Sequence, residues 1–193
     1  MSAGFVYRPH VATAEGVFTP DIVLDRLEVA AGNRRFPVSV ERLACGDAIE
    51  VVGDDTRARG AVALIAASGG ALLGIGADHV DGALAHDPGR ATQICAKPLA
   101  RGVWRFAEIA GHLAEIVLRT ESVDDAGRSR ETEIALSAIA ALPADGAVTR
   151  ATVILAHPGD DADALPGPAR VIVTLEDRRL ARRLTHRYAV RVL

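Results

Sequence analysis

The chain has 193 residues, 49% of them apolar, which is enough for one domain with a hydrophobic core of its own. Its formal net charge of −3 gives no argument for a nucleic-acid partner, and no apolar run reaches the roughly 20 residues that would make it a membrane protein. Cys45 and Cys95 are not spaced as a disulfide framework, and the start of the sequence shows no signal segment, so we expect a cytoplasmic protein.

The first twenty residues show no sustained hydrophobic period and contain Pro9 and Pro20. We therefore expect residues 1–20 to form an extended N-terminal arm and residues 21–193 to form a single domain. The run at residues 22–30 fits either a strand or a short helix, and the sequence does not decide between them.

Three apolar runs predict neighbouring antiparallel strands at residues 49–53, 61–67 and 71–77. Their lengths and β-branched residues are typical of strands, and the Gly69-Gly70 pair between the last two predicts a hairpin turn. The third strand would deliver the carboxylate and the imidazole that follow it into a pocket.

The second half of the chain mixes helical and strand periods. Residues 104–118 begin with a helical spacing and end as a strand, and the Ala-rich run at residues 131–142 predicts a helix that Pro143 stops. Strong strands are predicted at residues 151–157 and 171–176, and the alternating last six residues close the sheet. The strand count indicates a mainly β, α+β domain with two or three short helices.

A polar constellation follows the predicted strand at residues 71–77. Asp78, His79 and Asp81 come first, and Gln93 and Lys97 follow in the next loop. Successive strand residues point to opposite faces, so the chain must turn here for Asp78 and His79 to enter one cavity. The alternative is an Asx-type turn with solvated charges, and the spacing alone leaves both interpretations open.

Lys97 is the one lysine of the chain and stands before a proline in an apolar setting. There it can clamp an anion or, with a lowered pKa, carry a proton, but a surface lysine with a partly buried stem fits the same sequence. Cys95 fits a buried structural thiol, and His112 and His157 lack the paired spacing of a zinc site.

The segment from Arg178 to Arg191 holds six arginines around a single aromatic residue. Acidic stretches elsewhere offset its charge, so the pattern is more typical of a solvated face than of a nucleic-acid groove. Binding of an anionic substrate or an acidic partner stays open as an alternative.

Three segments together resemble an uncharacterised bacterial branch of the fumarylacetoacetate hydrolase-like superfamily. They read GIGADHVDGALAHD, ATQICAKPLARGVWRFAEIAGHLAEIVLRT and VIVTLEDRRLARRLTHRYAVRVL. The branch carries a strand that ends in a Ser-Asp-His-Thr-Asp-Arg type motif, then a Lys-Gln-x-Cys-x-Lys-Pro type segment and a tryptophan that opens the next element. The similarity covers residues 40–120 and 165–193, and the combination is more specific than any one piece.

This resemblance implies a β-roll that commonly forms a homodimer and acts as a hydrolase, lyase or isomerase on oxo acids, enols or 1,3-dicarbonyl compounds. Most members hold Mg²⁺ or Mn²⁺ with a Glu-x-Glu pair and a downstream Asp, and the cation polarises the substrate as a Lewis acid. By position, Asp78 matches the downstream metal ligand and Lys97 matches the substrate-side lysine, while His79 and Asp81 fall in the same turn.

The chain departs from this pattern where the Glu-x-Glu pair belongs. The sequence there reads Gly60-Ala61-Val62-Ala63, and Asp78 alone offers too few oxygens for Mg²⁺, so we expect no metal and no cofactor.

Two hypotheses follow from this departure. In the first, the chain binds a small anionic organic molecule and catalyses metal-independent acid/base chemistry, with Asp78 or His79 as the base and Lys97 stabilising the enolate. The residues expected to bind the substrate are Asp81, Gln93 and Trp104. In the second hypothesis, the chain has lost catalysis and serves as a small-molecule-binding or partner subunit.

Overall fold

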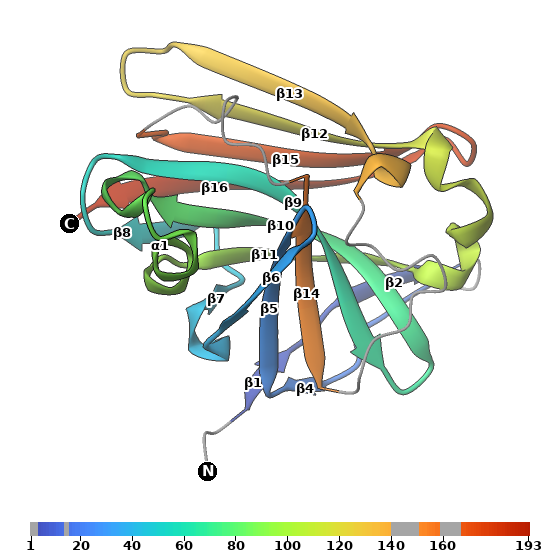
Figure 1. Cartoon of the computed structure of the whole chain (residues 1–193). Helices are drawn as coiled ribbons and strands as arrows, with labels where there is room; N and C mark the ends of the chain where they lie inside the picture. Colours follow the sequence, from blue (N-terminus) through green and yellow to red (C-terminus); the bar gives the residue numbers. More distant parts are fainter. Residues whose placement is uncertain (1–3, 14–15, 140–150, 159–166) are drawn as a thin grey trace.

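The computed structural model describes residues 4–13, 16–139, 151–158 and 167–193 (Figure 1). The strands are, in chain order, β1 (Phe5–Tyr7), β2 (His10–Thr13), β3 (Gly16–Phe18), β4 (Ile22–Leu24), β5 (Arg26–Ala31), β6 (Arg34–Val38), β7 (Leu43–Ala44), β8 (Ala48–Val51), β9 (Thr56–Ala67), β10 (Gly70–Asp81), β11 (Lys97–Arg105), β12 (Ile116–Val123), β13 (Ser129–Ala135), β14 (Thr152–His157), β15 (Arg170–Asp177) and β16 (Arg182–Val192). The helical elements are α1 (Pro88–Ile94) and the 3-10 turns η1 (Val40–Arg42), η2 (Gly82–Leu84), η3 (Phe106–Glu108), η4 (Ala110–Glu115) and η5 (Leu136–Ala138).

Two main sheets contain fourteen of the sixteen described strands, and β1 and β4 form a separate two-stranded sheet. The larger has nine strands in the order β3-β2-β11-β10-β9-β14-β5-β6, with β7 paired to β11, and the smaller has five in the order β13-β12-β15-β16-β8. Figure 1 shows the five-stranded sheet lying across one end of the long strands β9 and β10, whose hairpin turn projects away from it. The mainly β class predicted from the sequence is therefore confirmed, and no helix in the described part of the chain is long and apolar enough to cross a membrane.

The hairpin of β9 and β10 carries the central residues of the site. Its antiparallel register runs from Gly70 opposite Ala67 to Asp81 opposite Thr56, so the predicted Gly-Gly turn is confirmed. Strand β10 continues through Asp78 and His79, and the turn that we expected at these two residues is wrong. Pairing with β9 along the whole strand satisfies the backbone groups there, which removes the reason for the chain to turn.

Several predicted elements are wrong in type or in partner. The run at residues 49–53 does form a strand, β8, but it pairs with β16 in the other sheet instead of with β9. The helix expected over residues 131–142 is strand β13 up to Ala135, paired with β12, followed by one 3-10 turn; residues 140–142 lie outside the described part. Residues 22–30, for which strand and helix both stayed open, are covered by the strands β4 and β5, whereas residues 106–115, expected to begin as a short helix, form 3-10 turns.

The described part of the N-terminal residues 1–20 forms the strands β1, β2 and β3, which pair with other strands of the chain. Strand β2 pairs in parallel with β11, and β1 pairs with β4. Tyr7 and Val11 are buried, and the Tyr7 hydroxyl donates a hydrogen bond to the Ala100 carbonyl. The arm thus contributes to the hydrophobic core as well as to the sheet edge.

Strand β9 is buried on both faces, because one hydrophobic cluster lies on each side of it. Val62 and Leu64 pack into the cluster under the five-stranded sheet, whereas Ala61, Ala63 and Ile65 pack into the cluster on the other face. A strand buried on both faces reads as a continuous apolar run, which explains why residues 61–67 show no alternation.

Candidate functional site

Asp78 is the centre of a buried polar cluster. Its side chain and that of Lys97 have no exposed surface, and the Lys97 Nζ lies 3.0 Å from Asp78 Oδ1. The Thr92 hydroxyl donates to the same oxygen at 2.5 Å, and Lys97 Nζ also donates to the His79 carbonyl at 2.6 Å. The two residues that the sequence singles out most strongly, Asp78 and Lys97, are therefore brought together in the interior.

The second carboxylate oxygen of Asp78 faces two more basic side chains. Arg59 Nη1 and His157 Nε2 each lie 3.4 Å from Asp78 Oδ2. A buried carboxylate is tolerated when cations and donors surround it in this way. One carboxylate therefore holds three basic groups from three different strands.

Each partner of Asp78 is positioned by a separate element. Arg59 stands directly opposite Asp78 in the β9–β10 register, and Lys97 is the first residue of β11. His157 is the last residue of β14. Thr92 lies on α1, which begins with Pro88 after the Asp87 side chain caps it by accepting from Arg90 N. Local cap chemistry thus turns Thr92 towards the strand that carries Asp78.

Electrostatics keep Asp78 ionised despite its burial. Burial by itself raises the pKa of Asp78, but the Lys97 ammonium, the His157 imidazole and the Thr92 hydroxyl together lower it well below its usual range. Asp78 is thus a permanent anion at physiological pH, with both oxygens already engaged.

His79 belongs to a different environment from Asp78. Because β10 stays extended, its imidazole points to the opposite face, where Nε2 lies 2.8 Å from the Tyr188 hydroxyl and Nδ1 lies 3.3 Å from the Thr56 hydroxyl. Burial, followed by the nearby Lys97 charge, lowers the pKa of His79 to about 3. His79 is therefore a neutral core residue, and the expectation that it shares one cavity with Asp78 is wrong.

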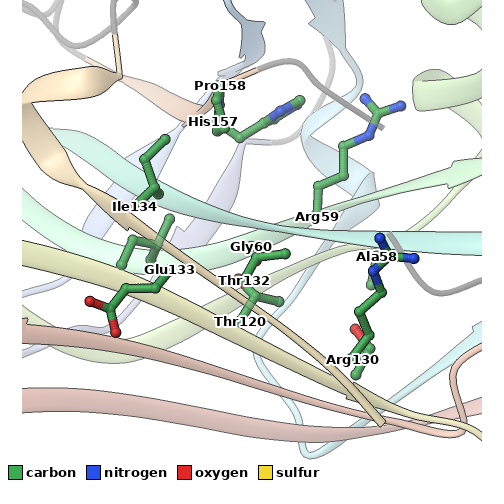
Figure 2. A pocket seen from close by; sticks show the side chains of 12 residues that line it. Ala58, Arg59, Gly60, Thr120, Arg130, Thr132, Glu133, Ile134, His157 and Pro158 are labelled. Atoms are coloured by element: carbon green, nitrogen blue, oxygen red, sulfur yellow. The ribbon is translucent and has the colours of Figure 1, made fainter. Parts of the chain in front are cut away.

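A cleft of about 250 Å³ lies next to the Asp78 cluster (Figure 2). It is bounded by β9, the inner face of β12 and β13, and the end of β14. Arg59 and His157 belong to both the cleft wall and the Asp78 cluster. The full lining is Ala58, Arg59, Gly60, Leu118, Thr120, Ser122, Arg130, Thr132, Glu133, Ile134, His157 and Pro158.

Gly60 lets β9 and β12 approach each other at the floor of this cleft. A Cβ at Gly60 would overlap the Thr120 side chain, so no other residue fits at this position without a shift. The crossing of the two sheets, and with it the shape of the cleft, depends on this glycine.

The three residues expected to bind substrate lie away from this cluster. Asp81 caps η2 by accepting from Ala83 N, and Gln93 is exposed and donates to the Pro37 carbonyl. Trp104 is buried in the core at the far end of β11, with the Arg182 guanidinium 4.5 Å above its ring. These residues were expected to lie together because they are close in sequence, but helix α1 and the nine-residue strand β11 separate them in the structure.

Three residues of the site were not predicted as such: Arg59, Thr92 and His157. His157 was set aside because it lacks a metal-binding spacing. The sequence did contain a signal for the position of His157. The residue ends a strongly apolar run and stands directly before a proline, and the last side chain of such a strand lies at a sheet edge. Arg59 carried a signal of the same kind, as a charge at the start of a buried strand.

The side chains around Asp78 do not fit a divalent cation. Ala61 and Ala63 are fully buried on the face of β9 that Asp78 shares, where Leu155 and Leu99 also pack. Mg²⁺ and Mn²⁺ need several oxygen ligands, whereas Asp78 is surrounded by Lys97, Arg59 and His157. In the described ranges, no three His, Cys, Asp or Glu side chains are grouped as metal ligands.

The remaining polar features have structural partners. His112 Nε2 lies 3.2 Å from the buried Asp177 carboxylate, and Cys95 is buried, as predicted. In the basic C-terminal segment, Arg178 pairs with Glu133 at 3.0 Å and Arg182 pairs with Glu108 at 2.8 Å. Part of the basic strip is thus used in ion pairs that tie the sheets and turns together.

Three solved structures show the same fold over nearly the whole chain. A 5-carboxymethyl-2-hydroxymuconate delta-isomerase from Mycobacterium smegmatis matches with a TM-score of 0.61 and 13% identity, covering 97% of this chain and 98% of that one. A 2-keto-3-deoxyarabinonate dehydratase matches with a TM-score of 0.63 and 12% identity, covering 94% and 78%. A 2-hydroxyhepta-2,4-diene-1,7-dioate isomerase from Mycobacterium marinum matches with a TM-score of 0.58 and 13% identity, covering 99% of both chains.

Sequence comparison adds the family. No curated protein matches the chain at the level of sequence. The family model described as "Protein of unknown function (DUF2848)" matches residues 24–188. The chain therefore belongs to the DUF2848 family, and its fold is the fumarylacetoacetate hydrolase-like β-roll that the sequence motifs predicted.

Proposed function

We propose that this protein binds a small oxo acid or enol in the cleft between β9, β12 and β13 and acts on it by metal-independent acid/base chemistry. One observation carries the proposal: Arg59 and His157 line the cleft and at the same time contact the buried Asp78 carboxylate. A cleft wall with cations and an imidazole, backed by a fixed negative charge, suits proton transfer next to a carbonyl group.

In this proposal the two arginines of the cleft bind the acid group. Arg59 and Arg130 both line the cleft, and a guanidinium binds a carboxylate through two parallel hydrogen bonds. Arg59 would also face the carbonyl oxygen, where negative charge grows as the enolate forms.

His157 would carry the proton, and Asp78 and Lys97 would position it. The imidazole takes the proton from the carbon beside the carbonyl, the C–H electron pair moves into the new C=C bond, and the carbonyl oxygen becomes the enolate oxygen. Asp78, held as an anion by Lys97, stabilises the imidazolium that forms. Return of the proton to the same carbon or a neighbouring one completes an exchange or an isomerisation.

The similar structures support the coarse part of this proposal. Two are named as isomerases and one as a dehydratase, and each name gives a small carboxylate as the substrate of that protein. The DUF2848 chain has Ala61 and Ala63 where the superfamily resemblance places its metal ligands, so we propose side-chain chemistry for it.

The contacts of the Asp78 carboxylate favour a second function, which is binding without catalysis. Both of its oxygens are engaged, and His157 is 1% exposed, as suits a structural cluster below a binding cleft. In that case the protein binds the small anion without converting it.

Proton exchange tests the two functions against each other. The protein is incubated in D₂O with a 2-oxo acid, and exchange of the C3 protons is followed by NMR while binding is measured by calorimetry. We expect exchange with the wild type, loss of exchange with retained binding in His157→Gln, and loss of binding in Arg59→Gln. Arg183→Gln, an exposed arginine on β16, is the matched control.

The outcomes separate the alternatives. Binding that depends on Arg59, with no exchange in the wild type, would establish the non-catalytic function. Absence of both binding and exchange for a panel of oxo acids and 1,3-dicarbonyl compounds would overturn both.

A further inference from the structure

A second hollow of the molecule lies at the other end of the β9–β10 hairpin from Asp78. It is a groove of about 390 Å³ that borders the hairpin turn, and Leu72 is part of its lining. About 20 Å of extended strand separates Leu72 from Asp78. The groove and the cleft beside Asp78 share none of their described lining residues. The volume of the groove falls within the range of about 300 to 1,000 Å³ that is usual for small-molecule sites.

The floor of this groove is one apolar face of the nine-stranded sheet. The register of β10, β11, β2 and β3 places Leu72, Val11 and Phe18 on the same face. The rest of the lining comes mainly from residues 66–69 at the hairpin turn and residues 20–23 at the start of β4. Leu72 and Val11 are buried, whereas Phe18 leaves 44% of its surface exposed. Exposed apolar surface around a groove is typical of a ligand-binding site.

Arg105 is the one cation among the described residues that line the groove. It stands directly opposite Leu72 in the sheet, and its guanidinium carbon lies 5.7 Å from the centre of the Phe18 ring. Within the part of the chain that the structure describes, Arg105 has no carboxylate partner. The carboxylate of the lining, Asp21, instead pairs with Arg8 at 2.8 Å. The groove therefore combines an apolar floor with one positive charge that has no counter-ion in the described ranges.

We propose that this groove binds a medium-chain fatty acid, with the carboxylate at Arg105 and the tail along Leu72 and Val11. A guanidinium binds a carboxylate through two parallel hydrogen bonds, and the tail removes apolar surface from water. One cation, with Asp21 also in the lining, suits the single charge of a carboxylate better than the nearly double charge of a phosphate group. This site is separate from the cleft of the proposed function and needs nothing from the Asp78 cluster.

Octanoate and octan-1-ol form the matched probe pair, because they share the tail and differ in the charge of the head group. We expect octanoate to bind the whole chain about tenfold more tightly in isothermal titration calorimetry, since only octanoate forms a charge-assisted hydrogen bond with Arg105. Hexanoate should bind about tenfold more weakly than octanoate, because its tail buries two fewer CH₂ groups.

Variants at the head and along the tail test the orientation. Arg105→Gln should remove the advantage of octanoate over octan-1-ol, whereas Arg101→Gln, an exposed arginine of the same strand outside the groove, should keep it. Ala67→Leu should weaken both probes, because Ala67 lines the groove and packs with the hydrophobic cluster on that face. Ala71→Leu is the matched control, since Ala71 packs with the cluster on the other face. Circular dichroism confirms that each variant is folded.

Three results would overturn the proposal. Equal affinities for octanoate and octan-1-ol would show that Arg105 does not receive the head group. Binding that neither Arg105→Gln nor Ala67→Leu changes would place the fatty acid elsewhere on the molecule. If neither probe binds, the groove is not a fatty-acid site, and sedimentation of the wild type and Phe18→Ser then shows whether a second copy of the chain covers it. None of these measurements depends on oxo-acid binding or exchange, so a failure here leaves the proposed function as it stands.

Discussion

Asp78 shows how much a buried carboxylate depends on the groups around it. Its carboxylate is fully buried and has Lys97, Thr92, Arg59 and His157 around it. Removing one partner from such a group leaves a charge in a medium of low polarity, which is far more costly than never having placed the pair there. The cluster therefore makes Lys97 a stability residue as well as a site residue.

The substitution Lys97→Met tests this role. We expect the free energy of unfolding to fall by about 3 kcal/mol or more, because the buried Asp78 loses its nearest cation. The double variant Lys97→Met with Asp78→Asn should recover part of this loss, since it removes both charges. Urea denaturation of the three proteins gives the values. A single variant as stable as the wild type would show that Arg59 and His157 suffice to hold the anion.

The pH dependence of stability depends in part on His79. Burial lowers its pKa from 6.5 to about 3 in the folded protein, so between these values the unfolded state binds the extra proton. Stability is therefore fully present above pH 6.5 and falls as the pH drops towards 3, with a limiting slope of about 1.4 kcal/mol per pH unit for one proton. Denaturation of the wild type and His79→Gln at pH 4 to 7 should show a shallower slope in the variant; equal slopes would mean that His79 does not titrate in this window.

At the scale of elements, the sequence predicts what is local. The hairpin of β9 and β10 follows from β-branched content and the Gly69-Gly70 turn, and both are visible in a short window of sequence. The pairing partner of β8 is not visible in a short window of sequence. Strand β8 pairs with β16, which lies more than a hundred residues later, and nothing in the run 48–51 encodes that register. Strand β13 was mistaken for the start of a helix because the Ala-rich run 131–142 continues beyond it, and nothing in that run shows the pairing with β12.

The residues of the candidate site also differ in whether local sequence could predict them. Asp78 and Lys97 could be predicted because both stand in one short polar segment, Asp78 directly after a predicted strand and Lys97 in the loop that was expected to follow it. His157 and Arg59 could not be placed beside them, since β14 enters the sheet next to β9 only through long-range pairing. Helix α1 did carry a local signal, an N-cap aspartate followed by proline at Asp87-Pro88, which indicates a helix start.

Close packing of β10 against its neighbours gives a prediction for Gly76. A Cβ there would overlap the Pro98 carbonyl oxygen and lie 3.0 Å from a Leu155 methyl group. Gly76→Ala should therefore destabilise the fold by about 1 to 3 kcal/mol, the range for overpacking a core. Gly69→Ala, in the exposed hairpin turn where a Cβ meets nothing within 4 Å, is the control and should be close to neutral in thermal denaturation. Equal effects of the two changes would contradict the packing argument.

For the whole molecule, the packing of one face of β9 explains why the described residues offer no site for a hard cation. The face of β9 that carries Ala61 and Ala63 packs against Leu155, Val153 and other aliphatic side chains, and polar groups begin only at the Asp78 end. A site for a hard cation needs space and oxygen ligands, and here the same volume is filled by close-packed carbon. The homodimer implied by the superfamily resemblance stays a prediction, to be checked by light scattering.

Metal independence is the prediction that concerns the molecule as a whole. A ligand stabilises a protein only if it binds the native state more tightly than the unfolded state, so Mg²⁺ or Mn²⁺ without a native site should leave the thermal midpoint unchanged. The measurement compares midpoints of the purified protein after treatment with a chelator, with and without each cation at millimolar concentration. We expect no shift in the thermal midpoint, because Lys97 and Arg59 already neutralise Asp78 and would repel a divalent cation. A saturable rise that Asp78→Asn abolishes would mean that other oxygen ligands join Asp78, and the proposed acid/base chemistry would then have to give way to a metal-dependent one.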